Sequence, residues 1–338
     1  MCVGTISDIV PLVDENRVIT KLGLLLVAQT KNMGLRSLLM SSGYKNLDST
    51  TISFGVAPRI NACGRMGHAD EALKLFLSKD IYEVNELTKK LNDYNKMRQE
   101  KEKSIYEDAV NQIEKNKLYE NCAIVVGGDN WHHGVIGIVS SKITDLYFKP
   151  SILLCYEGDL AKGSGRSIPG FDLHDALMKC QDTIEKFGGH SMAIGITIKK
   201  DNFDKFAKEL EHIAKSSKID EIIPIINVDA KINLNEVSRE TVESLKQLEP
   251  FGEGNKTPIF ALKNLKVDSI RSLSEGKHIK MTLKDGNSVV NAIGFNLGYL
   301  ADEYRIGDKI DVVGTLEINS FNGVDSLQIN LKDVMKSI

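Results

Sequence analysis

Residues 79–117 contain neither glycine nor proline, and this uninterrupted stretch constrains the fold more than any other feature. Apolar residues recur along it at the spacing of one helix face: Val84, Leu87, Leu91, Tyr94, Ile105, Ala109 and Ile113. That spacing predicts one long helix. The apolar stripe fades from Arg98 to Ser104, so we expect this part to be solvated and to bridge two domains. A helix docked along a single domain is the alternative.

The composition is that of an ordinary globular protein with two or three domains. The chain has 338 residues, of which 42% are hydrophobic and 26% charged. These values exclude a largely disordered, collagen-like or wholly coiled-coil chain. The formal charge of −3 lacks the basic excess of a protein that coats DNA, although a local basic groove remains compatible with it.

Cysteine spacing and hydropathy exclude further classes of protein. The five cysteines are scattered without a C-x-x-C pair, which argues against a disulfide framework or a zinc knuckle. The longest apolar run, Leu22 to Ala28, is too short to cross a bilayer, so a transmembrane protein is excluded. The first residues, MCVGTISDIVPLVDE, carry acids where a secretory signal carries Lys or Arg. We therefore expect a cytoplasmic protein.

The part of the chain after the long helix changes character near residue 222. Up to that point strand-like and helix-like runs alternate, which predicts α/β organisation: Ala123 to Val126, Val135 to Leu146, Ser151 to Tyr156, Leu173 to Phe187, Ala193 to Ile198 and Phe203 to Ile213. Beyond it, short strand-like runs flank the hairpin signals Asp285-Gly286 and Asn322-Gly323. These signals predict a small β-barrel at this end.

The first 78 residues begin with a short apolar run, Val3 to Val10, which predicts a buried strand followed by helices. A buried strand without neighbouring strands cannot complete a parallel sheet, so we expect an N-terminal portion to be missing. Asp8 closes this run, where α/β enzymes place metal ligands. The same carboxylate would also suit a helix cap or a turn.

Two glycine-containing segments place basic side chains next to helices. The segment FGVAPRINACGRMGHADEAL predicts a loop that presents four polar side chains to phosphate groups: Arg59, Asn61, Arg65 and His68. Alternatively it is a structural loop whose arginines pair with local acids. In DNWHHGVIGIVSSK, His132 and His133 fall at a helix N-terminus, which favours anions. Metal binding is disfavoured because adjacent side chains diverge at a helix start.

Two further segments suit an oxyanion. In KGSGRSIPGFDLHDAL, small residues around Ser164 would let backbone amides approach a phosphate, and Arg166 adds a bidentate fork. In KFGGHSMAIGI, Gly188 and Gly189 precede a strand and His190 is a potential phosphate donor. Each segment taken alone would also be compatible with an ordinary turn. A Walker A string is absent from the sequence.

Taken in order, six segments resemble the RecJ family of single-stranded-DNA-specific 5′ exonucleases, within the DHH phosphoesterase superfamily: GTISDIVPL, GVAPRINACGRMGH, WHHGVIGIVSSK, GSGRSIPGFDLHDAL, FGGHSMAIG and LEPFGEGN. The resemblance covers essentially the whole chain. It implies the C-terminal part of a metal-binding DHH domain at 1–78, a connecting helix at 79–117, a DHH-associated α/β domain at 118–218 and an OB-fold at 222–338.

The resemblance also implies roles for individual residues. It assigns Ser164 and Arg166 to a 5′-terminal phosphate, and it assigns a second set to a nucleic-acid groove: Arg59, Asn61, Arg65, His132, His133 and His190. On the barrel, the candidates for binding single-stranded nucleic acid are Lys277, His278, Lys280 and Phe295. The alternative is that they belong to an ordinary β-strand surface. The partners that the resemblance implies are single-stranded DNA with a 5′ end, a single-strand-binding protein and a helicase. It also implies a monomer that acts in DNA repair and recombination.

The metal motifs of this family form the main departure. Proteins of this family use two Mn²⁺ or Mg²⁺ ions to hydrolyse the phosphodiester bond. The sequence lacks the residues that hold these ions in the family, namely the Asp-His-His string and the earlier aspartates. Only Asp8 matches a family metal ligand, so we expect a chain that starts after most of the metal motifs and is inactive by itself. The alternatives are a non-catalytic single-strand-binding module and a DHH phosphoesterase acting on nanoRNA or cyclic dinucleotides.

Overall fold

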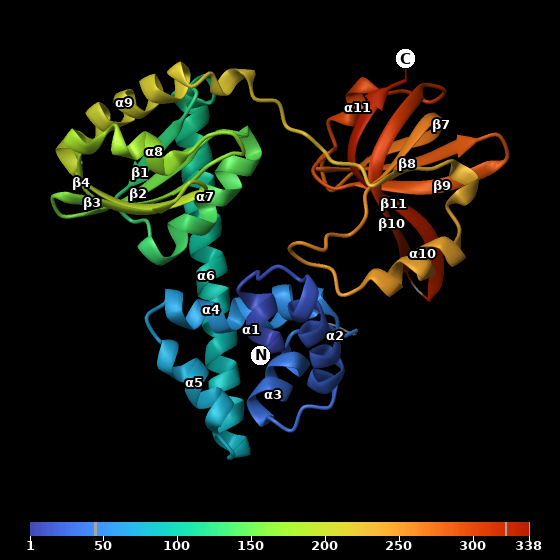
Figure 1. The fold of residues 1–338 in the computed structure, drawn as a ribbon, viewed down its shortest axis with the longest axis horizontal. Coiled ribbons are helices and arrows are strands. Elements are labelled where there is room, and N and C mark those ends of the chain that lie inside the picture. Colours follow the sequence, from blue (N-terminus) through green and yellow to red (C-terminus); the bar gives the residue numbers. More distant parts are fainter. Residues whose placement is uncertain (44–45, 322, 338) are drawn as a thin grey trace. The chain divides into compact units, whose positions relative to one another are not determined.

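The structure is a computed structural model that describes residues 1–43, 46–321 and 323–337. Its elements are labelled in Figure 1, and they form two compact units. Unit 1 comprises Met1–Gln29, Asn46–Ser53 and Ile226–Ile338, and unit 2 comprises Thr30–Lys45 and Phe54–Ile225. The first 78 residues therefore contribute to both units.

Unit 2 is organised around the long helix α6 (Ile81–Lys115), which confirms the helix predicted at 79–117. One part of α6 packs against the short helices α3 (Met33–Ser41), α4 (Ala57–Arg65) and α5 (Ala69–Leu77). The other part packs against α7 (His133–Tyr147). The stretch from Arg98 to Ser104 is largely exposed, as predicted, but Glu102 within it is buried.

A mixed sheet of five strands forms the rest of unit 2, in the order β1-β2-β3-β5-β4. The strands are β1 (Ile124–Gly128), β2 (Ser151–Glu157), β3 (Leu160–Arg166), β4 (Ile184–His190) and β5 (Ala193–Lys199). Helix α7 connects β1 to β2, and these two strands pair in parallel. The other neighbours pair antiparallel. The predicted α/β organisation is confirmed.

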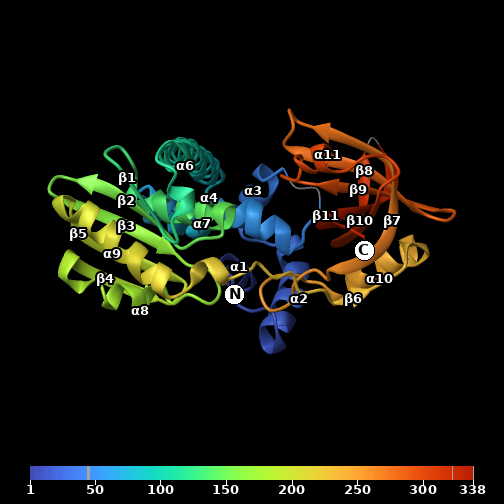
Figure 2. The same cartoon turned by 90° about the horizontal axis from the view of Figure 1, so that it is seen from above.

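Alternation of side chains along the strands gives the sheet two different faces. One face packs against α8 (Leu173–Met178) and α9 (Phe203–Ser216) through a core that contains Phe206, Ile152 and Ile196. The other face packs against α6 and α7 through a separate core. Figure 2 shows the sheet between these two helical layers. Helix α7 contacts β2 and β3, whereas Gly188 and Gly195 on β4 and β5 are exposed.

Two predictions about secondary structure are wrong. The run from Val3 to Val10 is no strand, because α1 (Cys2–Ser7) is a helix that buries Cys2 and Ile6 one turn apart. The run from Leu173 to Phe187 is not one helix, since α8 ends at Met178 and β4 begins at Ile184. Short apolar runs do not distinguish helix from strand, and pairing with β5 decides the outcome for β4.

Unit 1 contains the predicted β-barrel. Its five strands close in the order β7-β8-β9-β11-β10, because β10 also pairs with β7: β7 (Phe260–Leu273), β8 (His278–Asp285), β9 (Ser288–Gly294), β10 (Lys309–Phe321) and β11 (Val324–Lys336). The two-residue strand β6 (Ala230–Lys231) extends the edge of β7. Two short helices complete the domain: α10 (Arg239–Leu245) and α11 (Leu300–Glu303).

Both hairpin signals lie between antiparallel strands. Asp285-Gly286 joins β8 to β9, with Gly286 at a φ of 55°. The strands β10 and β11 also pair antiparallel, and Gly323 has a φ of 79°, but Asn322 lies outside the described residues. The small β-barrel predicted for this end of the chain is confirmed.

The first helices of unit 1 are joined to the segment LEPFGEGN. Arg17 in α2 (Asp14–Ala28) donates hydrogen bonds to the carbonyl oxygens of Gln247 and Leu248, at 3.3 and 3.0 Å. The amide of Leu12 donates to the carbonyl oxygen of Glu253 at 2.6 Å. This motif, which the sequence offered as a family signature, therefore has a structural role in attaching the N-terminal helices to the barrel domain.

The cysteines and the hydropathy of the helices agree with the sequence analysis. All five cysteines are buried and free. None of the helices that the structure describes is both long and apolar enough to span a lipid bilayer.

Candidate functional site

The residues of the predicted phosphate segment lie on β3, a strand in the middle of the sheet. Ser164 and Arg166 project toward α7, while Gly163 and Gly165 alternate toward the core beneath α9. A Cβ at Gly163 would lie 2.6 Å from Leu154 and 2.8 Å from Ile196, so only glycine fits there. In the sequence Gly-Ser-Gly-Arg, the two glycines thus allow close packing on one face of the sheet, and the serine and arginine present polar groups on the other.

This arrangement corrects the prediction that backbone amides around Ser164 approach a phosphate. The amides of β3 are engaged in pairing with β2 and β5, so the strand offers side chains rather than a backbone cradle. Arg166 Nη1 donates to Ser164 Oγ at 3.1 Å and to the carbonyl oxygen of Gly165 at 2.8 Å. The guanidinium, which carries five N–H donors, is thereby fixed in orientation.

Helix α7 approaches this strand at Gly137. A Cβ at Gly137 would lie 3.0 Å from Ser164 Oγ and 3.5 Å from Arg166 Nη2. Gly137 is the fifth residue of α7, so the N-terminal part of this helix, with its positive dipole end, lies near the two polar side chains of β3. The sequence motif gave no sign of this contact, although a glycine inside an otherwise apolar helix often marks close packing.

His132 and His133 occupy the start of α7, as predicted. His132 is the N-cap, and its Nδ1 accepts from the amide of Gly134 at 3.1 Å, so its Nε2 carries the proton. Burial lowers the pKa of His132, and the charges of Lys101 and His133 lower it further. His132 is thus a neutral hydrogen-bond donor at pH 7. His133 is exposed, stacks on His132 at 5.4 Å and lies 3.8 Å from Glu157 Oε1.

Arg65 joins the same cluster from α4. It ends α4, and its Nη1 donates to the carbonyl oxygen of Gly134 at 2.9 Å, which places it beside the start of α7. Partial burial lowers the pKa of Arg65, the charge of Arg98 lowers it further, and Glu102 opposes this. Burial and the charge of Arg65 likewise lower the pKa of Arg166. Two guanidinium groups that repel each other favour a bound anion.

The other residues of FGVAPRINACGRMGHADEAL do not form the predicted loop. This segment continues a π-helical turn (Thr51–Val56) into α4, so Arg59 and Asn61 lie on a helix. Arg59 Nε donates to Asn92 Oδ1 at 2.7 Å, and its Nη2 donates to the carbonyl oxygen of Ser41 at 3.3 Å. Arg59 thus holds α4 against its neighbours. Asn61 is exposed.

His190 belongs to the same face of the sheet as Arg166. It ends β4 opposite Ala193, and Ala193 on β5 lies opposite Arg166, so the two side chains emerge about 10 Å apart, separated by one strand. The next row across the strands is Ser164, Gly195 and Gly188. A Cβ at Gly188 would contact no atom within 4 Å. The predicted glycines therefore lie within a strand rather than before one, and they leave a bare surface beside Ser164.

Together these side chains describe one candidate anion site in unit 2. Arg65, His132, Ser164 and Arg166 surround the first turns of α7, and His190 borders the bare surface at the end of the sheet. The site offers cationic and neutral donors in a fixed geometry. This is the chemistry that a terminal phosphate requires.

Asp8 does not belong to such a cluster. It is exposed in the turn that follows α1, and its amide donates to the carbonyl oxygen of Gly4. The position after a strand, expected from the sequence, is therefore wrong. Among the described residues no group of three or more His, Cys, Asp and Glu side chains is placed to hold a metal ion. These residues do not fit a two-metal site.

The barrel in unit 1 carries the remaining predicted residues. His278 Nδ1 accepts from the amide of Asn296 at 3.0 Å, and its ring meets that of Phe295 edge-on at 5.3 Å. Phe295 is 53% exposed, and Lys277, which directly precedes His278 in the sequence, is also exposed. Lys280 lies opposite Arg271 on β7. An exposed ring with nearby cations suits stacking on an unpaired base.

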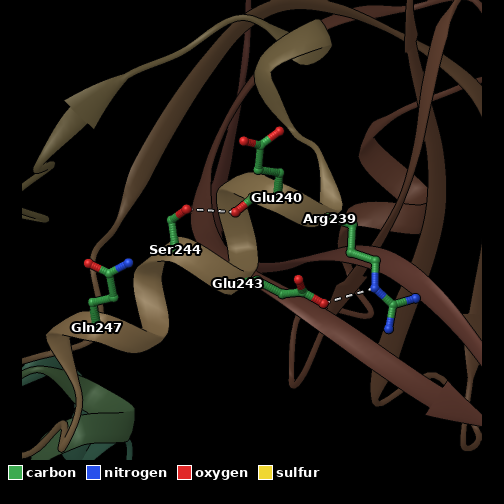
Figure 3. Close-up of a pocket in the computed structure, with 5 residues that line it drawn as sticks. All are labelled: Arg239, Glu240, Glu243, Ser244 and Gln247. Atoms are coloured by element: carbon green, nitrogen blue, oxygen red, sulfur yellow. Dashed lines mark hydrogen bonds and ion pairs between the residues drawn. The ribbon is translucent and has the colours of Figure 1, made fainter.

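A hollow along α10 is unsuited to an anion. It is lined by Arg239, Glu240, Glu243, Ser244 and Gln247, as Figure 3 shows. Arg239 is engaged with Glu243 at 2.9 Å and with Asp325 at 2.9 Å. Ser244 Oγ donates to the carbonyl oxygen of Glu240 at 2.8 Å. The hollow therefore combines acidic side chains with a cation that is already paired.

Comparison with known proteins identifies the two domains. The family described as "RecJ OB domain" matches residues 228–333, and that described as "DHHA1 domain" matches residues 116–216. The single-stranded-DNA-specific exonuclease RecJ of Bacillus subtilis is 36% identical over 341 residues, which cover 99% of this chain and 43% of the relative. The chain is a RecJ-like protein of the DHH superfamily.

Other RecJ proteins agree with this assignment. The Haemophilus influenzae exonuclease is 31% identical over 97% of this chain and 60% of its own length. The crystal structure of Thermus thermophilus RecJ with Mn²⁺ superposes with a TM-score of 0.86 at 30% identity, covering 100% of this chain and 49% of that chain. A second crystal structure of that protein contains Mg²⁺. The chain spans about half the length of the RecJ relatives that it matches.

Proposed function

We propose that this chain forms the part of a single-stranded-DNA-specific 5′→3′ exonuclease that holds the 5′ end of the strand. The observation that carries the proposal is the cluster of Ser164 and Arg166 on β3 against Gly137 of α7, with Arg65 beside it. A terminal phosphate bears more charge and more free oxygens than a diester, so this cluster favours a phosphorylated end. The RecJ relatives are named single-stranded-DNA-specific exonucleases, which supports the substrate class.

Each site residue has a role in this proposal. Arg166 and Arg65 neutralise the terminal phosphate, Ser164 and His132 donate hydrogen bonds to it, and His133 and His190 line the path of the strand. Asn61 lies exposed on α4 and contributes to the same groove, while Arg59 acts by holding α4 in place. On the barrel, Phe295 stacks on a base and Lys277 contacts the backbone.

Hydrolysis needs groups beyond those that the structure describes. We propose that the complete site uses Mn²⁺ or Mg²⁺, which the solved Thermus thermophilus structures contain, and that this chain supplies only Asp8 to it. The proposal extends to a cytoplasmic monomer that acts in repair and recombination with a single-strand-binding protein and a helicase. Family membership is the support for these last points. The two alternatives considered from the sequence gain no comparable support.

Preference for single strands is the first test. The chain should bind a 5′-phosphorylated single-stranded oligonucleotide more tightly than the same sequence annealed to its complement, because the bare sheet surface and Phe295 contact unpaired nucleotides. Equilibrium binding at one fixed salt concentration measures this difference. Equal affinity for the single strand and the duplex would contradict the proposed substrate.

Metal-dependent cleavage is the second test. We expect this chain with Mn²⁺ to release no nucleotides from single-stranded DNA above the level of Mn²⁺ alone, because one aspartate cannot bridge two ions. Asp8→Ala should give the same result. Release that depends on Asp8 would show that a complete site exists in this chain and would contradict the expectation of inactivity.

A further inference from the structure

A buried carboxylate lies on α6 in the stretch whose charges the sequence suggested were solvated. Glu102 is 6% exposed, and its two oxygens accept from cations on two helices. Arg98 Nη1 lies 2.5 Å from Oε2, and Lys142 Nζ of α7 lies 2.5 Å from Oε1. The other Arg98 nitrogen, Nη2, donates to Oδ1 of the buried Asn95 at 2.6 Å. Glu102 therefore joins α6 to α7 through an ion-pair cluster in which the side chains of Arg98 and Glu102 are mostly buried, whereas that of Lys142 is 53% exposed.

The charge of Glu102 is held in place by its partners. Burial would raise the pKa of Glu102, but hydrogen bonds and charges from Lys142 and Arg98 outweigh it and lower the pKa. A buried ion pair such as Arg98–Glu102 adds little net stability, because desolvation offsets most of the attraction. Removing one partner, in contrast, leaves an uncompensated charge. The cluster therefore fixes where positive charge lies rather than simply adding stability.

The same cluster reaches the phosphate site. Arg98 and Glu102 act on Arg65 with opposite signs, and Arg65 in turn acts on Arg166. Lys142 belongs to α7, the helix whose first residues carry His132 and whose Gly137 lies against Ser164. Glu102 thus stands at the junction of the three helices α4, α6 and α7 that supply the cationic side of the site.

We propose that Glu102 is a positioning residue that holds Arg98 and Lys142 in ion pairs. Of the nearby cations, only Arg65 and Arg166 then contact the terminal phosphate. The inference rests on the proposed function, since it concerns the selectivity of that site. If Arg98 and Lys142 were released, they would compete for backbone phosphates. The strand would then bind through internal diesters as well as through its end.

The decisive variant is Glu102→Gln, which keeps the size of the side chain and removes its charge. The ratio of affinities for 5′-phosphoryl and 5′-hydroxyl single strands should fall about fivefold, mainly because the 5′-hydroxyl strand binds more tightly. The slope of log K against log salt should steepen by about 0.7 to 1.4, as one or two further cations engage phosphates. Glu107→Gln is the matched control, because Glu107 lies on the same helix in an exposed pair with Lys103 at 3.8 Å.

A second variant separates charge placement from simple structural support. Combining Glu102→Gln with Lys142→Gln restores the charge balance and removes one unpaired cation. The salt slope should then fall back by about 0.7, the contribution of one cation, which loss of packing would not produce. A double variant that keeps the steep slope would overturn the inference, and so would a Glu102→Gln variant with unchanged end preference and slope.

The pH dependence of stability gives a reading without DNA. The charged groups that contact Glu102 are Arg98 on α6 and Lys142 on α7, and Arg65 on α4 interacts with it electrostatically. Because the folded-state pKa of Glu102 is lowered, its contribution to stability is present above the unfolded pKa and is lost as the pH falls through the folded value. The difference in Tm between the unsubstituted chain and Glu102→Gln should therefore shrink from pH 7 to about pH 3. A constant difference would contradict an ionised Glu102.

The outcomes distinguish this inference from the proposed function. If the unsubstituted chain binds both end types equally, the 5′-end site fails, and the inferred selectivity role of Glu102 fails with it. If the unsubstituted chain prefers the phosphate and Glu102→Gln behaves like Glu107→Gln, only the inference fails.

Discussion

Arg166→Ala should remove the preference of this chain for a 5′-phosphorylated strand. Charge-assisted hydrogen bonds contribute about 1.5 to 3 kcal/mol each, so the affinity for the phosphorylated strand should fall about tenfold or more. The affinity for the 5′-hydroxyl strand should change far less, because that end presents no dianion to the guanidinium. Equilibrium binding of matched 5′-phosphoryl and 5′-hydroxyl oligonucleotides at one salt concentration measures both effects.

Two controls make this result specific to the geometry of Arg166. Arg166→Lys keeps the charge but loses the planar fork, so it should recover only part of the preference. Lys205→Ala removes a cation from α9, which packs on the opposite face of the sheet, and should leave the preference unchanged. An equal loss for both end types in Arg166→Ala, or an equal effect of Lys205→Ala, would indicate general electrostatic attraction instead of an end site.

The sequence predicted the architecture best where its periodicity is long. The helical spacing across residues 79–117 identifies α6 because several turns repeat the same pattern, and Asp285-Gly286 identifies the β8–β9 hairpin through its turn geometry. It failed for Val3 to Val10, where fewer than ten residues fit either a helix or a strand. Local pattern alone cannot decide such a segment, because burial against distant residues does.

The candidate site shows the same division. His132 and His133 were placed correctly at a helix start, because glycine and an apolar run follow them directly in sequence. The prediction that backbone amides around Ser164 approach a phosphate is wrong, because the sequence does not show that these amides pair with neighbouring strands. Glu102 was missed altogether, since its partner Lys142 lies on another helix. Only the i,i+4 spacing of Arg98 and Glu102 could have pointed to it.

Substitution by alanine should affect stability very differently at the two glycines that precede His190. Gly189 has a φ of 139°, and a Cβ there would collide with the carbonyl oxygen of Ala193 and lie 2.8 Å from the Cα of Ile194. An L side chain in this backbone region costs about 1 to 3 kcal/mol, and displacing the neighbouring strand adds about as much again. Gly189→Ala should therefore lower the free energy of unfolding of unit 2 by about 2 to 6 kcal/mol.

Gly188→Ala is the matched control, because a Cβ at Gly188 meets nothing within 4 Å and its φ lies outside the left-handed region. It should change the free energy of unfolding by less than about 1 kcal/mol. The added methyl group would instead occupy the bare surface beside Gly195, so Gly188→Ala should weaken binding of the strand while the fold stays intact. Urea unfolding of both variants, followed by equilibrium binding for Gly188→Ala, measures the contrast. Similar stabilities for the two variants would mean that the strained backbone at Gly189 does not explain the Gly-Gly-His sequence. Undiminished binding by Gly188→Ala would mean that the single-stranded DNA does not pass over the bare surface of the sheet.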